Sequence, residues 1–239
     1  MNTAKLKKYA PQARREFISA VSKQLNQLGI YSDKQISDVK EQGSVLSIEG
    51  KAFPIGVKTA RERLVRKVKT FGYAQLIEQV AYTWFTRFCA LRFMDVNGYN
   101  RVGVLSPSEG QIQPEILAEA KSGIIDDTQF NRRIADQIKG LLGGSISSQD
   151  AQAEAYRLLI VGSCNSLFEH MPFLFERIQD FTELLMPDDL LSENSILAKM
   201  RAVMTPESCQ DVEIIGWLYQ FYISEKKDEV IAKLKKNVK

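Results

Sequence analysis

The chain contains few of the residues from which catalytic and metal sites are commonly built. Its 239 residues include one histidine, His170, and three cysteines. A single histidine excludes zinc sites with two histidine ligands and the facial triads of iron enzymes. It also makes any serine, histidine and aspartate triad depend on one residue beside a proline, Pro172. We expect His170 to be structural, and we assign no metal site.

Glycine and proline motifs of nucleotide chemistry are missing as well. No two glycines are separated by a single residue, which excludes the dinucleotide fingerprint, the kinase glycine loop and the FxGxG turn of adenosylmethionine enzymes. No two prolines are adjacent, so the chain has no Asp/Asn-Pro-Pro-Tyr/Phe loop, with which amino-methyltransferases hold their target base. We therefore assign no catalytic and no cofactor-binding residue to this chain.

Long apolar runs are absent too. No stretch approaches the roughly 20 apolar residues that span a bilayer, and the N-terminus, MNTAKLKKY, is basic and polar, unlike a secretory signal. The cysteines, Cys89, Cys164 and Cys209, are odd in number and far apart, which suits buried thiols in a reducing compartment. We expect a cytoplasmic protein with no membrane partner.

The net charge of +3 conceals a strong asymmetry. Residues 1–75 carry 15 Lys/Arg against 6 Asp/Glu, residues 76–225 carry 11 against 21, and residues 226–239 carry 6 against 2. We divide the chain accordingly into basic N-terminal helices with a β-hairpin, a helical body, and a basic, frayed C-terminal helix. The basic end could face nucleic acid, or the oppositely charged segments could attract one another within the molecule.

Hydrophobic periodicity predicts a mainly α fold, a multi-helix domain with one small β-hairpin near residues 44–55. In the hairpin, Val45, Leu46 and Ile48 precede a turn at Gly50. A short first turn capped by Thr3 should be followed by a helix that begins at Pro11 and ends at Gly29. Further helices are expected over residues 57–72, 76–99, 116–121, 130–143, 150–170, 173–185 and 196–204 (capped by Ser192), and after residue 206.

The helix expected over residues 57–72 is strongly basic. Its apolar positions are Ala60, Leu64, Val68 and Phe71, and its six cations oppose only Glu62. The candidate contacts to DNA phosphates are Lys58, Arg61, Arg63, Arg66, Lys67 and Lys69. The alternative is that these cations form a face in contact only with solvent.

The next helix is too apolar for a surface helix. On a 3.6-residue period its structural core residues are Trp84, Phe85, Phe88 and Leu91. Arg87 and Arg92 lie about 140° apart around the same helix, so they cannot share one solvent stripe. At least one of them should require an anionic partner inside the molecule.

Three stretches together resemble a known family: VAYTWFTRFCALRFMDVNGY, the preceding GKAFPIGV and RERLVRKVKTFGYAQLIEQ, and the late IIGWLYQFYISEKKDEV. They resemble the N-terminal region of the PglX family, the adenine-specific DNA methyltransferases of bacteriophage exclusion (BREX) systems. The resemblance implies that a methyltransferase domain follows residue 239, with transfer of a methyl group from S-adenosylmethionine to adenine N6 in DNA. No catalytic residue of the family carries over, because its motifs fall outside this chain.

The resemblance implies a parent enzyme of phage defence, of which this segment alone is not catalytic. We expect the segment to support the catalytic domain and to contact the DNA backbone. One alternative is a docking platform for other BREX subunits through acidic side chains, with candidates Asp126, Asp127, Asp188, Asp189 and Glu193. Another alternative is a standalone, non-enzymatic regulatory protein.

Overall fold

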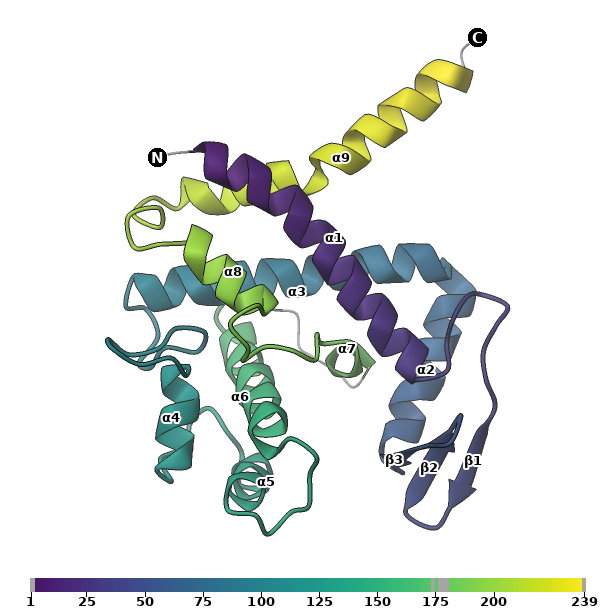
Figure 1. Ribbon diagram of the computed structural model, residues 1–239, viewed down its shortest axis with the longest axis vertical. Coiled ribbons are helices and arrows are strands. Elements are labelled where there is room, and N and C mark those ends of the chain that lie inside the picture. The colour runs from purple at the N-terminus through teal and green to yellow at the C-terminus, as the bar shows by residue number, and fades with distance from the viewer. Residues whose placement is uncertain (1–2, 173–174, 176–180, 238–239) are drawn as a thin grey trace.

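The computed structural model describes residues 3–172, 175 and 181–237, and within these residues it contains nine helices and one three-stranded sheet. The mainly α prediction is confirmed (Figure 1). The elements are α1 (Thr3–Gln27), β1 (Val39–Gln42), β2 (Val45–Ile48), β3 (Lys51–Pro54), α2 (Val57–Phe71), α3 (Tyr73–Val96), α4 (Glu115–Lys121), α5 (Arg132–Leu142), α6 (Ala151–Phe168), α7 (Phe181–Leu184), α8 (Ile196–Val203) and α9 (Glu213–Asn237).

The first helix is a single element, so the expected break at Pro11 is wrong. Pro11 lies inside α1, where it removes one backbone hydrogen bond. The buried stripe of α1 continues across it, from Leu6 and Ala10 to Ala13 and Phe17. Burial of each large apolar side chain is worth ~1.5–3 kcal/mol, so the packing of this stripe offsets the loss at Pro11.

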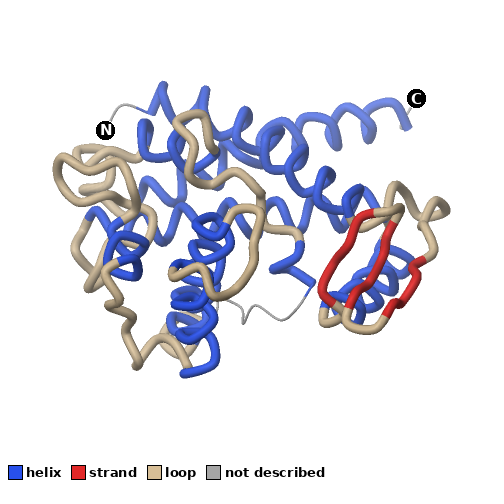
Figure 2. Tube along the Cα trace, turned by 60° about the horizontal axis from the view of Figure 1, so that its bottom comes forward, coloured by secondary structure: helices blue, strands red, loops and turns tan. Residues whose placement is uncertain are grey.

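The predicted hairpin is confirmed, and its two strands, β2 and β3, belong to a three-stranded sheet. β2 and β3 pair antiparallel with Leu46 opposite Phe53, and they turn at Glu49 and Gly50, both with positive φ (50° and 80°), as in a type I′ turn. The third strand, β1, pairs antiparallel with β2 and was missed. Figure 2 shows the strands at one end of the molecule, beside the helix that Figure 1 labels α2.

A single hydrophobic core extends from Leu6 in α1 to Tyr222 in α9, so residues 1–75 and 76–225 share one core. The core is built around α3, whose Trp84, Phe85, Phe88 and Leu91 are all 2% exposed or less. The Phe17 ring of α1 lies 5.8 Å from Phe85, and the Tyr222 ring of α9 stacks 4.3 Å from Phe85. α1 and α9 therefore meet over the middle of α3.

The two arginines of α3 differ in their surroundings. Arg92 donates from Nε to the Met204 carbonyl (3.0 Å) and from Nη1 to Ser106 Oγ (2.6 Å), so its direct acceptors are neutral. The Arg87 guanidinium is buried and lies 5.4 Å from the Trp84 ring centre. Arg87 is buried and Arg92 is half-buried, in agreement with the prediction that the two cannot share one solvent stripe.

The loop after α3 is organised by Asp95. Its carboxylate accepts hydrogen bonds from the backbone N–H groups of Val104, Leu105 and Ser106, from Ser106 Oγ, and from the Asn100 side chain, all between 2.7 and 3.0 Å. Five hydrogen bonds to one charged group fix this loop against the end of α3.

Several helix ends differ from the sequence-based expectation. Ser195, and not Ser192, caps α8 by accepting the Ala198 N–H (3.2 Å), while Ser192 instead bonds Asp189. Only α7 is described within the helix expected over residues 173–185, most of which lies outside the described residues. α6 ends at Phe168, so His170 lies just beyond it and is exposed.

α9 is one continuous helix, so the separate C-terminal helix expected over residues 226–239 is the last part of α9. Its end extends away from the other helices (Figure 1). Across the described residues no helix combines the length and apolar character needed to cross a membrane. The three cysteines are free and buried, as predicted.

Candidate nucleic-acid interface

The basic helix α2 is fixed by one buried face. Ala60, Leu64 and Val68 follow at four-residue spacing and are all buried. The helix ends where Gly72 takes a φ of 88°, a conformation that favours glycine, and the chain turns directly into α3. Side chains on the rest of the helix surface therefore face outward.

Arg61 belongs to the buried side and is removed from the candidate phosphate contacts. It is 6% exposed, and it donates from Nε to the Leu28 carbonyl (2.8 Å) and from Nη2 to the Ser37 carbonyl (2.6 Å). Burial lowers the pKa of Arg61 from its ordinary value. Its guanidinium thus ties α2 to the end of α1 and to the loop before β1.

Lys58 also has a partner within the molecule. Its Nζ lies 2.7 Å from a carboxylate oxygen of Glu41 in β1 and 4.0 Å from one of Glu62. The hydrogen bond to Glu41 raises the pKa of Lys58. Lys58 joins the helix to the sheet, and it would have to exchange Glu41 for a phosphate in order to bind DNA.

The remaining four candidates, Arg63, Arg66, Lys67 and Lys69, are exposed along α2. Phe71 accompanies them: it continues the apolar stripe by spacing, but on the last turn of the helix it is 43% exposed. The Lys67 ammonium lies 4.8 Å from the centre of the Phe71 ring, a cation–π contact. The exposed side of α2 is therefore positive and carries one aromatic ring.

A hollow of about 470 Å³ lies between α2 and the loop formed by residues 33–39. Its cationic lining residues are Lys34, Arg61, Arg66 and Lys69, and its acidic ones are Asp33, Asp38 and Glu62. Sequence reasoning missed the contribution of Lys34, because the loop has no periodicity that would place it beside α2. The loop thus adds one cation, Lys34, and two carboxylates, Asp33 and Asp38, beside the helix.

The cations in the middle of α1, by contrast, are paired with the acidic body. Arg14 pairs with Glu78 of α3 and lies 3.8 Å from Glu225 of α9, which also pairs with Arg15. Farther along, Lys23 lies 3.5 Å from Asp188. For these three cations, attraction within the molecule is the correct interpretation of the charge asymmetry.

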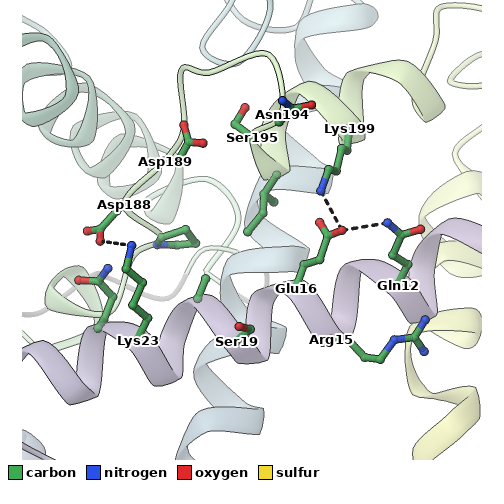
Figure 3. A pocket seen from close by; sticks show the side chains of 14 residues that line it. Gln12, Arg15, Glu16, Ser19, Lys23, Asp188, Asp189, Asn194, Ser195 and Lys199 are labelled. Carbon is green, nitrogen blue, oxygen red and sulfur yellow. Dashed lines mark hydrogen bonds and ion pairs between the residues drawn. The ribbon is translucent and has the colours of Figure 1, made fainter.

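The acidic docking candidates are mostly engaged in internal contacts. A pocket of about 450 Å³ lies between α1 and α8, and Glu16 Oε1 lies 2.9 Å from Lys199 Nζ at its edge. Figure 3 shows Asp188 facing Lys23 in this pocket. Asp189 accepts the Ser192 N–H.

Asp126, another docking candidate, accepts hydrogen bonds from Thr128, which lower its pKa. Asp126 is half-buried and the other four candidates are exposed, but Asp188 and Asp189 also have the internal contacts given above. The acidic residues therefore serve mainly as turn caps and ion-pair partners.

Comparison with known proteins confirms the predicted resemblance. The chain is 40% identical over 247 aligned positions to the adenine-specific methyltransferase BrxX of Escherichia coli O9:H4 (strain HS), an alignment that covers 99% of this chain. It is 32% identical over 254 positions to the adenine-specific methyltransferase PglX of Lacticaseibacillus casei (strain Zhang), with 98% covered. The chain spans about a fifth of the length of these curated relatives. No family model matches it.

Proposed function

We propose that this chain is the N-terminal helical module of an adenine-specific DNA methyltransferase of BREX type, and that it supports the catalytic domain and contacts the DNA backbone through α2. The observation that carries the methyltransferase part is similarity along 98–99% of the chain to two proteins of that name. The parent enzyme would take its methyl group from S-adenosylmethionine in the cytoplasm, with other BREX subunits as protein partners.

The contrast between the two basic helices supports the DNA-binding part. Arg14 and Arg15 of α1 pair with carboxylates of α3 and α9, whereas Arg66, Lys67 and Lys69 of α2 are exposed. Phosphate contacts of this kind give affinity without sequence specificity, and the affinity falls steeply with salt. Sequence recognition would therefore lie in another part of the parent protein.

Charge reversal tests the contribution of α2. In the triple variant Arg66→Glu, Lys67→Glu, Lys69→Glu, DNA affinity should fall at least about tenfold, equally for two duplexes of unrelated sequence. The slope of log affinity against log salt concentration should become shallower by about one unit per lost phosphate contact. Fluorescence anisotropy with the full chain measures both quantities.

The matched control reverses three exposed lysines at the start of α1, Lys5, Lys7 and Lys8. It changes the net charge by the same amount and should leave most of the affinity in place. Equal losses in the two variants would mean that net charge, and not the α2 surface, governs binding. Unchanged affinity in the α2 variant would refute the proposed interface.

The parent protein is tested separately, by sequencing DNA downstream of the codon for residue 239. An open reading frame that continues into FxGxG and Asn-Pro-Pro-Tyr motifs would support the methyltransferase proposal. A stop codon at that point would favour the standalone regulatory protein. The acidic docking platform has no comparable support, because three of its five candidate residues have internal partners.

A further inference from the structure

One ridge of α2 combines positive charge with an exposed ring. Arg63, Lys67 and Phe71 follow one another at four-residue spacing, so they lie on the same side of the helix. Phe71 is 43% exposed, and the Lys67 ammonium lies 4.8 Å from its ring centre. A phosphate drawn to Lys67 would bring its nucleotide within reach of the Phe71 ring.

The position of Phe71 is well fixed. The chain turns at Gly72, and the next residue, Tyr73, donates its N–H to the Asp33 carboxylate (2.5 Å). The Tyr73 hydroxyl lies 3.2 Å from Ser22 Oγ and 3.3 Å from Asn26 Oδ1 in α1. Because the backbone beside Phe71 is held in this way, little ordering is needed when a ligand contacts the ring.

An aromatic ring at this place discriminates between forms of DNA. In a duplex the faces of the bases are stacked on one another, and only their edges are accessible in the grooves. An unpaired base exposes its face, and stacking on a protein aromatic is tolerant of base identity. Regular duplex would use the cations of α2 alone, whereas an unpaired strand would use the cations and the ring.

We propose that the α2 surface binds an unpaired stretch of DNA, with phosphates beside Arg63 and Lys67 and a base stacked on Phe71. This inference rests on the proposed DNA-backbone function of α2 and names the form of DNA that the surface prefers. The charge complementarity of the ridge to a polyanion and the exposed ring beside it are the two observations that carry it.

Anisotropy titrations of the full chain with a labelled oligothymidylate and with a duplex of equal length provide the test. Phe71→Ala should lower the affinity for the single strand roughly 5- to 100-fold, the range for loss of one stacked base, and should change duplex affinity less than about twofold. Phe71→Trp should retain single-strand binding, and its indole emission should be quenched when oligothymidylate is added.

Tyr99→Ala is the matched control, because Tyr99 is a 68% exposed aromatic just after the far end of α3. It should leave both affinities unchanged. Equal losses for single strand and duplex in Phe71→Ala, or no loss for either, would overturn the inference. If the α2 charge reversal weakens binding to both DNA forms while Phe71→Ala affects neither, the backbone function stands and only the stacking inference fails.

Discussion

α1 and α2 are both basic helices of the first 75 residues, but their cations have different neighbours. Arg14 and Arg15 of α1 meet carboxylates of α3 and α9 that lie 64 and 210 positions away in sequence. Lys67 of α2 lies over a ring of its own helix, and Arg66 borders an open hollow. The two helices are similar in composition, but Arg14 and Arg15 of α1 join that helix to its neighbours, whereas Arg66 and Lys67 of α2 form a positive surface.

The largest effect is expected at the buried cation of α1. Arg14→Ala should lower the free energy of unfolding by about 2–4 kcal/mol, because the largely buried Glu78 carboxylate loses its nearer partner and keeps the more exposed Lys226 at 3.9 Å. Urea denaturation measures the change. Arg15→Ala is the matched control, because Arg15 is 59% exposed and should cost less than about 1 kcal/mol. Equal losses in the two variants would show that burial does not set the strength of these pairs.

Arg61 should stabilise the fold, as the arginines of α1 do, although it lies on α2. Arg61→Ala leaves the Leu28 and Ser37 carbonyls without their donor, and we expect a loss of about 1.5–3 kcal/mol in thermal or urea unfolding. Arg61→Lys should restore little of it, because an ammonium cannot reproduce the two-armed contact of the guanidinium. An Arg61→Ala variant as stable as the parent chain would show that Arg61 does not stabilise the fold and would make it a candidate phosphate contact again.

The exposed cations of α2 should have almost no stabilising role. Replacing Arg66, Lys67 and Lys69 together by glutamine should change stability by less than about 0.5 kcal/mol per residue, because the relief of repulsion between like charges offsets the loss of the Lys67–Phe71 contact. Differential scanning calorimetry gives the comparison with the parent chain. A marked destabilisation would mean that these side chains hold the fold together, as those of α1 do.

The smallest effect concerns the sheet beside α2. Hydrogen bonds from Ser37 and Tyr31 lower the pKa of Glu49 from its ordinary value of 4.5. A lowered folded-state pKa stabilises the protein above pH 4.5, and this contribution is lost as the pH falls through the lowered value. Melting temperatures recorded from pH 6 downward should therefore decline less steeply below ~4.5 in Glu49→Gln. Parallel curves would show that Glu49 is not linked to folding.

Local patterns were enough to predict much of the fold. The alternation of Val45, Leu46 and Ile48 before a glycine predicted the hairpin, and apolar spacing predicted the core face of α3. β1 was not predictable in this way, because three of its four side chains are exposed and it joins the sheet through its backbone. Pro11 misled the prediction of α1, since packing across the whole molecule outweighed a local rule.

For the candidate interface, the sequence contained one signal that was overlooked. Arg61 stands three residues before Leu64 and four after Val57, so it falls on the inward side of α2 with the apolar residues. The position of Lys34 in the same hollow as Arg66 had no such signal, because it depends on how an irregular loop folds back on the helix. The ion pairs of the α1 cations could not be predicted either, because their partners are distant in sequence.

The pairing of α1 with α9 also constrains the order in which the chain is built. During synthesis at about 5–20 residues per second, Glu225 emerges some 10–40 s after Arg15, its partner 210 positions earlier. During most of that interval the flank of α1 that packs against α9 has no neighbour, while α3 is already available to cover Phe17 and α8 joins α1 shortly before α9 is made. The first helix made is therefore among the last to be completed, and a nascent chain that stalls before α9 would expose it to chaperones.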